Sequence, residues 1–180
     1  MIAELRLHYT PQDSFRFLDI GGASGDMCEA VKQSFPEAQV FCVDLLSRNL
    51  RDNKSLCVQA DAFKLPFPLS SFDVVHCSLF LHHFGTEEVK RLIHEMSSIS
   101  KRMVLIQDLH RSWISYYFLP LTQRLFGWHP ITVSDGMKSV AAGWKRNELC
   151  DILKQLEAPK PWKIRWHFPS FRFFIAIINK

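Results

Sequence analysis

FLDIGGASGD, residues 17–26, is the stretch that decides the fold of this chain. Its first four residues predict a buried strand, and the turn that follows holds three of the seven glycines in the chain: Gly21, Gly22 and Gly25. Glycine adopts backbone conformations with positive φ and lets the backbone approach a ligand closely. A strand that runs through such a turn into a helix is typical of a site that binds a small polar molecule.

The composition narrows the class of protein. The chain has 180 residues, 47% hydrophobic and 22% charged, which predicts one globular domain over residues 1–180. The formal net charge is +4, and the basic residues are scattered instead of concentrated as in nucleic-acid-binding proteins. The densest basic group, Lys160, Lys163 and Arg165 beside Trp162 and Trp166, predicts the solvated face of an edge strand. We therefore expect no nucleic-acid partner.

No segment predicts export or a membrane span. Residues 1–14 carry Glu4 and Arg6 without a long apolar run, unlike a signal peptide, and no apolar run reaches the ~18 residues that a span needs. The five cysteines form no C-x-x-C pair, and Cys42, Cys57 and Cys77 fall in predicted strands, where a reduced thiol packs as a small apolar group. These features predict a cytoplasmic protein without disulfides or a zinc site.

Apolar runs alternate with amphipathic segments along the chain. Strands are expected at 16–20, 38–44, 55–61, 71–80 and 102–109. Helices are expected after Gly25, at 46–51, from Thr86 as the N-cap, and at 146–156. Near-continuous apolar strands separated by helices predict an α/β fold, with a mostly parallel sheet and helices on both faces.

The C-terminal segment breaks this alternation. WKIRWHF and FRFFIAIIN are two predicted strands joined only by Pro169 and Ser170. A link this short cannot make a parallel crossover, so the two strands must be antiparallel neighbours. The sequence predicts a parallel sheet that ends in an antiparallel C-terminal hairpin.

Three acidic positions fall at the carboxyl ends of predicted strands. Asp19 opens the glycine turn, Asp44 ends the second strand, and Asp61 ends the third. A carboxylate after the second strand can accept hydrogen bonds from both hydroxyls of a ribose, and ligands of open α/β sheets bind at these strand ends. A dinucleotide enzyme needs a third glycine in register, where this chain has Asp26. An aspartate there favours a cationic ligand instead.

The chain resembles the class I S-adenosylmethionine-dependent methyltransferases. FLDIGGASGD is similar to the first motif of the family, VDLL to its ribose motif, and QADAFKLPFPLSSFDVV to its adenine-side and fourth-strand motifs. The resemblance spans roughly residues 15–178 and implies a Rossmann-like methyltransferase fold with a seven-stranded sheet and a reversed last strand. One departure is Ala23, where the family usually has glycine.

The resemblance also implies a binding role for individual residues. The cofactor would be S-adenosylmethionine, with the backbone of Gly21, Gly22 and Gly25 near its methionine portion and Asp19 oriented towards its ammonium. Asp44 and Leu45 would bind the ribose side, and Asp61 with the backbone of Ala62 would recognise adenine.

Candidates for the chemistry follow the fourth and fifth strands. His82 and His83 lie after the fourth strand, and a similar LHH segment occurs there in ubiquinone/menaquinone-type methyltransferases. Asp108 and His110 end the fifth strand. A general base among them would assist an alcohol or phenol acceptor, and the sequence does not choose between the adjacent histidines. No carboxylate cluster suited to magnesium is present, so no metal is expected.

Residues 112–145 form a long insertion rich in aromatic residues. Few residues precede the first strand, so we expect this insertion to act as the lid over the acceptor site. Its apolar character predicts a hydrophobic, aromatic or polyketide/quinone-like small-molecule acceptor, methylated on oxygen or carbon. An RNA or protein methyltransferase and a non-catalytic S-adenosylmethionine-binding protein remain alternatives, and a homodimer stays open.

Overall fold

The computed structural model describes residues 1–156, 161–167 and 170–179. In these residues seven strands form one sheet in the order β3-β2-β1-β4-β5-β7-β6. The strands are β1 (Arg16–Ile20), β2 (Gln39–Asp44), β3 (Leu56–Gln59), β4 (Phe72–Ser78), β5 (Ser100–Leu109), β6 (Trp162–His167) and β7 (Arg172–Ile178). Strands β1 to β5 are parallel, and β7 is antiparallel to both β5 and β6. The predicted fold class, including the reversed C-terminal hairpin, is confirmed.

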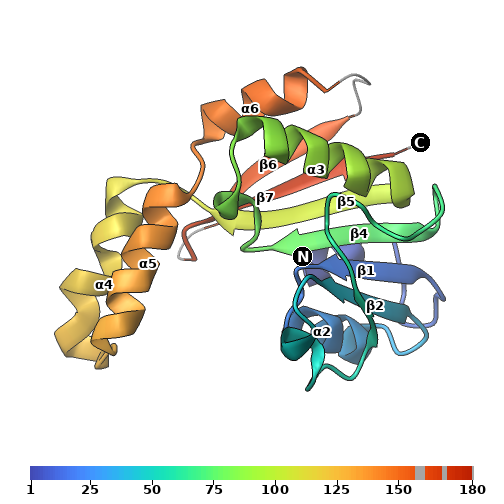
Figure 1. The fold of residues 1–180 in the computed structure, drawn as a ribbon, viewed down its shortest axis with the longest axis horizontal. Helices are drawn as coiled ribbons and strands as arrows, with labels where there is room; N and C mark the ends of the chain where they lie inside the picture. The colour runs from blue at the N-terminus through green and yellow to red at the C-terminus, as the bar shows by residue number, and fades with distance from the viewer. Residues whose placement is uncertain (157–160, 168–169, 180) are drawn as a thin grey trace.

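Helices cover both faces of the sheet (Figure 1). Helices α1 (Ile2–Leu5) and α2 (Asp26–Ser34) lie on one face, and α3 (Thr86–Ile99) and α6 (Arg146–Lys154) lie on the other. Two short 3-10 helices follow β2 and β4, namely η1 (Ser47–Leu50) and η2 (Leu81–His83). Each face has its own apolar core: Leu92, Ile93 and Leu149 belong to the core under α3 and α6, and Phe17 and Phe35 to the core under α2.

The strand periodicity divides β1 between these two cores. Leu18 and Ile20 belong to the core under α3 and α6, while Phe17 belongs to the core under α2. Successive side chains of a strand point to opposite faces, so Asp19 points to the α2 face together with Phe17. Because of this alternation, the carboxylate of Asp19 can contact only groups on the α2 face of the sheet.

The predicted N-cap of α3 is wrong by one residue. Thr86 is the first helical residue, and Gly85 is the N-cap. The Gly85 N–H donates to the carboxylate of Glu88 at 2.9 Å. A glutamate at the third helical position therefore supplies the capping hydrogen bond, and the threonine hydroxyl is not needed for it.

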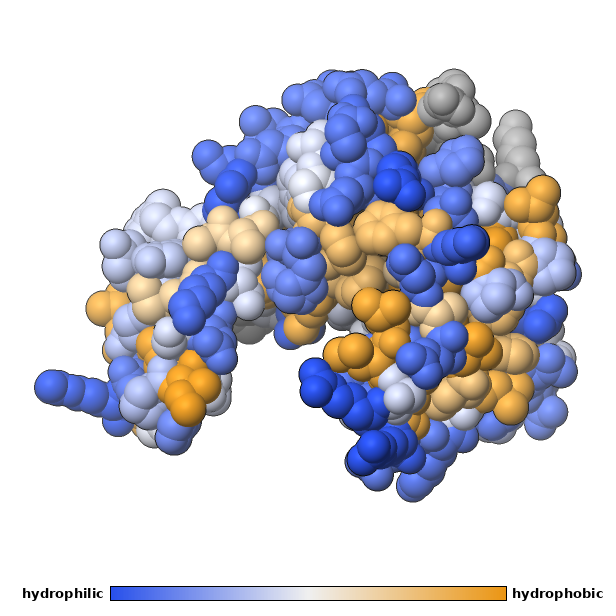
Figure 2. Space-filling model, viewed as in Figure 1, coloured by the Kyte–Doolittle hydropathy of each residue, from blue (hydrophilic) through white to orange (hydrophobic). Residues whose placement is uncertain are grey.

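The insertion at 112–145 folds into two helices, α4 (Trp113–Phe126) and α5 (Pro130–Ala142), called here the α4–α5 hairpin. Ser112 caps α4 by accepting the N–H of Ser115 at 3.2 Å, and Gly127 in the left-handed conformation ends that helix. The hairpin stands away from the sheet, on the side to which β4 and β5 point (Figure 1). Figure 2 shows a deep notch between the hairpin and the part of the molecule that carries α2.

The remaining expectations concern the surface and the cysteines. All five cysteines are free. Strand β6 is an edge strand of the sheet, as predicted for its basic group, although Lys160, Phe168 and Pro169 lie outside the described residues. Among the described residues, no helix combines the length and the apolar character needed to cross a membrane.

Candidate active site

The glycine turn connects β1 to α2 through tight backbone hydrogen bonds. The Gly21 N–H donates to the Val43 carbonyl at 2.8 Å, and the Gly25 N–H donates to the Gly22 carbonyl at 2.8 Å. Gly21 has a φ of +67°, and a Cβ there would lie 2.6 Å from a ring carbon of Phe80. This position therefore requires glycine for both its conformation and the approach of the Phe80 ring.

A cavity of about 300 Å³ lies beside this turn, at the carboxyl ends of β1, β2 and β3. Phe63, Phe80 and Phe84 form one wall, with ring centroids 5.1 Å apart for Phe63 and Phe84 and 5.0 Å apart for Phe80 and Phe84. Its lining includes five residues predicted to bind the cofactor: Gly21, Asp44, Leu45, Asp61 and Ala62. The cavity is therefore apolar on one side and edged by two carboxylates.

Asp44 is held rigidly at this cavity. Its side chain is buried, and Oδ1 accepts hydrogen bonds from the Leu46 N–H at 2.9 Å and from the Asn49 Nδ2 at 3.0 Å. Among the described residues, Oδ2 of Asp44 has no hydrogen-bond partner. One fixed carboxylate oxygen thus stays available at the cavity, which fits the two hydroxyls of a ribose.

The residues predicted on the adenine side also line this cavity. Asp61 is exposed, and its Oδ1 accepts the Phe63 N–H at 2.9 Å, which fixes the turn after β3. Ala62 is buried next to it, and Leu45 is 61% exposed at the rim. These positions fit a heterocycle held between apolar side chains and one carboxylate.

Asp19 lies elsewhere, together with Gly22 and Gly25, outside the lining of the cavity. The Asp19 side chain is 2% exposed, and its Oδ1 lies 2.7 Å from Nδ1 of His76. A Cβ on Gly22 would lie 2.6 Å from Oδ2 of Asp19, so the turn packs directly on this carboxylate. Contact of Asp19 with a cofactor ammonium stays a prediction. One feature of the sequence could have indicated its partner, because His76 is a histidine inside an apolar strand.

Asp108 organises the segment after β4. It is 2% exposed, and its Oδ2 accepts the N–H groups of Phe80, Leu81 and His82 at 3.0, 2.6 and 3.3 Å. Its Oδ1 lies 2.8 Å from Nδ1 of His82 and accepts the Leu109 N–H at 2.7 Å. One buried carboxylate therefore fixes both the backbone of η2 and the ring of His82.

The two other candidate histidines do not share this arrangement. His83 is exposed, with its ring centroid 4.1 Å from that of His82, and its pKa is lowered by partial burial and by His82, against a smaller opposite effect of Asp108. His110 packs at 4.5 Å from the Phe173 ring, and burial lowers its pKa. The structure thus joins His82 to Asp108 by a hydrogen bond, whereas the ring of His110 packs against Phe173. Within the part of the chain that the structure describes, no three histidine, cysteine or carboxylate side chains gather as metal ligands.

The strand order and the reversed β7 define the class of fold, a Rossmann-like sheet of the methyltransferase type. Residues 18–104 match the family model described as a methyltransferase domain. This stretch is a class I S-adenosylmethionine-dependent methyltransferase domain, of enzyme class 2.1.1.-, and the cofactor of such domains is S-adenosylmethionine.

Solved structures share this fold at low sequence identity. A candidate O-methyltransferase from Nostoc punctiforme is 17% identical, with a TM-score of 0.70 over 99% of this chain and 55% of that protein. Magnesium protoporphyrin IX methyltransferase from Synechocystis, solved with S-adenosylhomocysteine, is 16% identical, with a TM-score of 0.68 over 99% of this chain and 80% of that protein. The plantazolicin methyltransferase is 17% identical, with a TM-score of 0.71 over 92% of this chain and 76% of that protein. No curated protein matches the chain.

Proposed function

We propose that this protein transfers the methyl group of S-adenosylmethionine to an oxygen or carbon of a hydrophobic, aromatic or polyketide/quinone-like small molecule. The observation that carries the proposal is the His82–Asp108 pair, which lies at the carboxyl ends of β4 and β5. The same carboxylate binds the N–H of Phe80, whose ring lines the cofactor cavity. The pair is therefore connected directly to the wall of the cofactor site.

The hydrogen bond of the pair supports a separate role for each nitrogen of His82. A carboxylate accepts hydrogen bonds, so Nδ1 of His82 carries the proton that it donates to Asp108. Its Nε2 then has a free lone pair and can take a proton from the hydroxyl of an acceptor. Asp108 holds the ring and stabilises the imidazolium that forms, and the proton passes from Nε2 to water after the transfer.

The bound cofactor supplies a methyl carbon activated by its sulfonium. The chain contributes alignment and the exclusion of water, which together supply about 7–11 kcal/mol of the barrier in well-oriented reactions. A positioned base contributes about 10²–10⁴-fold for a hydroxyl acceptor. A carbon nucleophile with an acidic proton would use the same base.

The α4–α5 hairpin supports an apolar acceptor. It borders the notch (Figure 2), and Trp113, Tyr117 and Leu121 expose 74%, 50% and 79% of their surface. Exposed apolar area of this kind marks binding surfaces. We assign the hairpin, residues 112–145, as the lid that covers the acceptor. The names of two similar structures, for magnesium protoporphyrin IX and for plantazolicin, agree with a methyltransferase of small molecules and leave the acceptor open.

The test is formation of S-adenosylhomocysteine with a panel of phenols, quinols and polyketide-like acceptors. Turnover with an apolar hydroxyl acceptor that falls about 10²–10⁴-fold in His82→Ala, but much less in His83→Ala, supports the proposal. Cofactor binding without turnover on any of the panel indicates a non-catalytic binding protein. Turnover on RNA or a protein instead of the panel overturns the assigned acceptor class.

A further inference from the structure

The glycine turn contains one residue in an unfavourable conformation. Ala23 has a φ of +41°, between Gly21 at +67° and Gly25 at +85°. Positive φ is costly for a residue with a Cβ, and glycine adopts it freely. An alanine in this place needs a contact that offsets the cost and keeps the turn in a single conformation.

Asn53 makes that contact from the connection between η1 and β3. Its Nδ2 donates to the Ala23 carbonyl at 3.1 Å, across 30 positions of sequence. Its Oδ1 accepts the Ser55 N–H at 2.9 Å, which fixes which end of the carboxamide is the donor. The amide is thus held by its own segment while it binds the strained residue of the turn.

The same carboxamide packs on Gly25. A Cβ at Gly25 would lie 2.5 Å from both Cγ and Oδ1 of Asn53, so the amide lies against the Cα of the glycine. Gly25 is also the N-cap of α2, with a left-handed conformation and no side-chain cap. Asn53 therefore contacts the turn at the strained residue and at the point where α2 begins.

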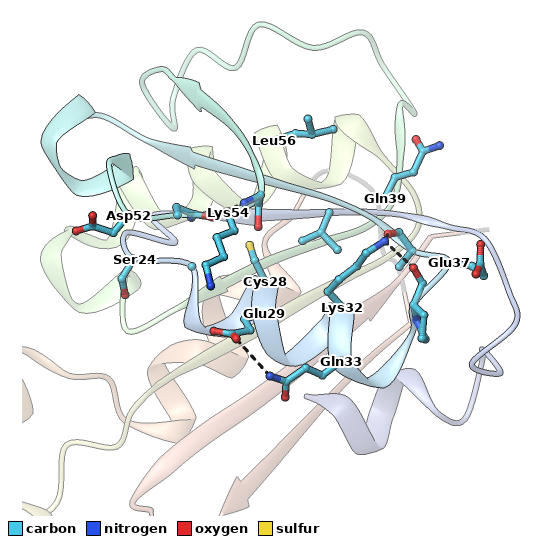
Figure 3. A pocket seen from close by; sticks show the side chains of 16 residues that line it. Ser24, Cys28, Glu29, Lys32, Gln33, Glu37, Gln39, Asp52, Lys54 and Leu56 are labelled. Carbon is cyan, nitrogen blue, oxygen red and sulfur yellow. Dashed lines mark hydrogen bonds between the residues drawn. The ribbon is translucent and has the colours of Figure 1, made fainter.

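A second cavity, of about 590 Å³, lies behind the turn on the α2 face. Asn53, Ser24 and Gly25 all line it, and Figure 3 shows Ser24 at one end and Lys54 extending towards Cys28 and Glu29 on α2. Since the space behind the turn is hollow, packing from this side is sparse. Among the described residues, the Ala23 carbonyl accepts its hydrogen bond from the carboxamide of Asn53.

We propose that Asn53 is a positioning residue for S-adenosylmethionine: its carboxamide holds the turn 21–25 in the binding conformation and offsets the alanine at position 23. The inference rests on the proposed function for its ligand, because it assumes that the turn binds the methionine portion of the cofactor. Asn53 does not line the cavity that contains Asp44, so it would be a determinant of cofactor affinity from outside that cavity.

The test is a double-mutant cycle measured by calorimetric titration of S-adenosylhomocysteine. Asn53→Asp keeps the size and the acceptor for Ser55 but removes the donor, and we expect its Kd to rise about tenfold, the effect of one lost hydrogen bond. S-adenosylhomocysteine carries both an ammonium and a carboxylate, so the negative charge that Asn53→Asp introduces can act on its binding with either sign. The uncharged variant Asn53→Ala separates the lost hydrogen bond from this charge. Asn53→Ala is expected to give a similar rise.

Ala23→Gly provides the rescue. It removes the cost of positive φ, so in the Asn53→Ala background it should restore the Kd to within roughly threefold of the wild type, whereas alone it should change little. Gln33→Ala is the matched control, because Gln33 is a carboxamide that lines the same cavity and binds Glu29 instead of the turn. A purely structural role of Asn53 would lower the melting temperature without a rescue by glycine.

Two results overturn the inference: an unchanged Kd in Asn53→Asp, or no rescue of Asn53→Ala by Ala23→Gly. If the wild type binds neither S-adenosylmethionine nor S-adenosylhomocysteine, the proposed function fails, and hydrogen exchange of the Gly25 amide decides the inference. That amide bonds to the Gly22 carbonyl within the turn. Faster exchange in Asn53→Asp, reversed by Ala23→Gly, supports the role of Asn53, and unchanged exchange refutes it.

Discussion

Asp108→Asn separates the tautomer of His82 from the folding of the chain. The carboxylate receives four backbone N–H groups and the ring of His82. A carboxamide accepts hydrogen bonds through one oxygen only. Three N–H groups face Oδ2, more than face Oδ1, so the amide oxygen takes the Oδ2 position. The NH₂ group then faces Nδ1 of His82 and the N–H of Leu109.

This orientation reverses the tautomer of His82. An NH₂ donor makes Nδ1 the acceptor, so the ring proton moves to Nε2, which can no longer take a proton from the acceptor. The expected loss in methyl transfer to a hydroxyl is about 10²–10⁴-fold. The Leu109 N–H loses its acceptor, at a cost of ~1–3 kcal/mol in the free energy of unfolding. For a domain of this size the melting temperature falls by about 2–12 °C.

Three measurements test this reasoning: the rate of S-adenosylhomocysteine formation, the melting temperature, and the ¹⁵N NMR shifts of the His82 ring. The NMR shifts report the tautomer without any acceptor. The matched control is His83→Ala, because His83 is adjacent to His82 but, among the described residues, makes no hydrogen bond to Asp108. A folded Asp108→Asn protein with an unchanged His82 tautomer, or with nearly full turnover, would refute the assignment of His82 as the base.

Three further predictions concern the cofactor site and pH. Asp44→Ala should weaken S-adenosylhomocysteine binding by at least about tenfold in calorimetry, since a charge-assisted hydrogen bond contributes ~1.5–3 kcal/mol; unchanged affinity would exclude Asp44 from the ribose site. Gly21→Ala should cost ~1–2 kcal/mol in unfolding free energy for its positive φ and displace Phe80, so denaturant unfolding and cofactor titration should both change. Burial lowers the pKa of His110 below its ordinary value of 6.5. As the pH falls, this histidine therefore takes up a proton at a higher pH in the unfolded chain than in the folded one, so the stability of the fold declines as pH falls through 6.5. The melting temperature should therefore decline between pH 7 and 5, and His110→Phe should reduce this decline. An unchanged dependence of the melting temperature on pH in His110→Phe would show that the burial of His110 is not its cause.

The sequence predicted the sheet well because its signals are local. Residues 16–20 and the glycine turn contain both the apolar strand and its exit, and β1 spans the same residues. The antiparallel pairing of β6 and β7 was predicted from the sequence because the segment that joins these strands is too short for a parallel crossover. The N-cap of α3 was missed because Thr86 is a residue type that favours the N-cap position, whereas the actual N-cap, Gly85, has no side chain to mark it.

The site was predicted less completely because its geometry depends on contacts between distant segments. The choice between His82 and His83 required the position of Asp108, which lies 26 residues beyond His82. The partner of Asp19 required the register of β1 against β4, which places Asp19 opposite His76. Asn53 gave no signal at all, because nothing local marks an asparagine that binds a turn 30 positions away.

The order of the strands has a consequence for how the protein is made. Strand β7 follows β6 in the chain but lies between β5 and β6 in the sheet. Until β7 has emerged from the ribosome, the ten residues of β5 present an unpaired edge, and β6 has no strand to pair with. Exposed edges of this kind favour pairing with other chains. This half of the sheet is therefore completed only after β7 has been synthesised, and nascent chains that stop before Arg172 should be the ones that need chaperones.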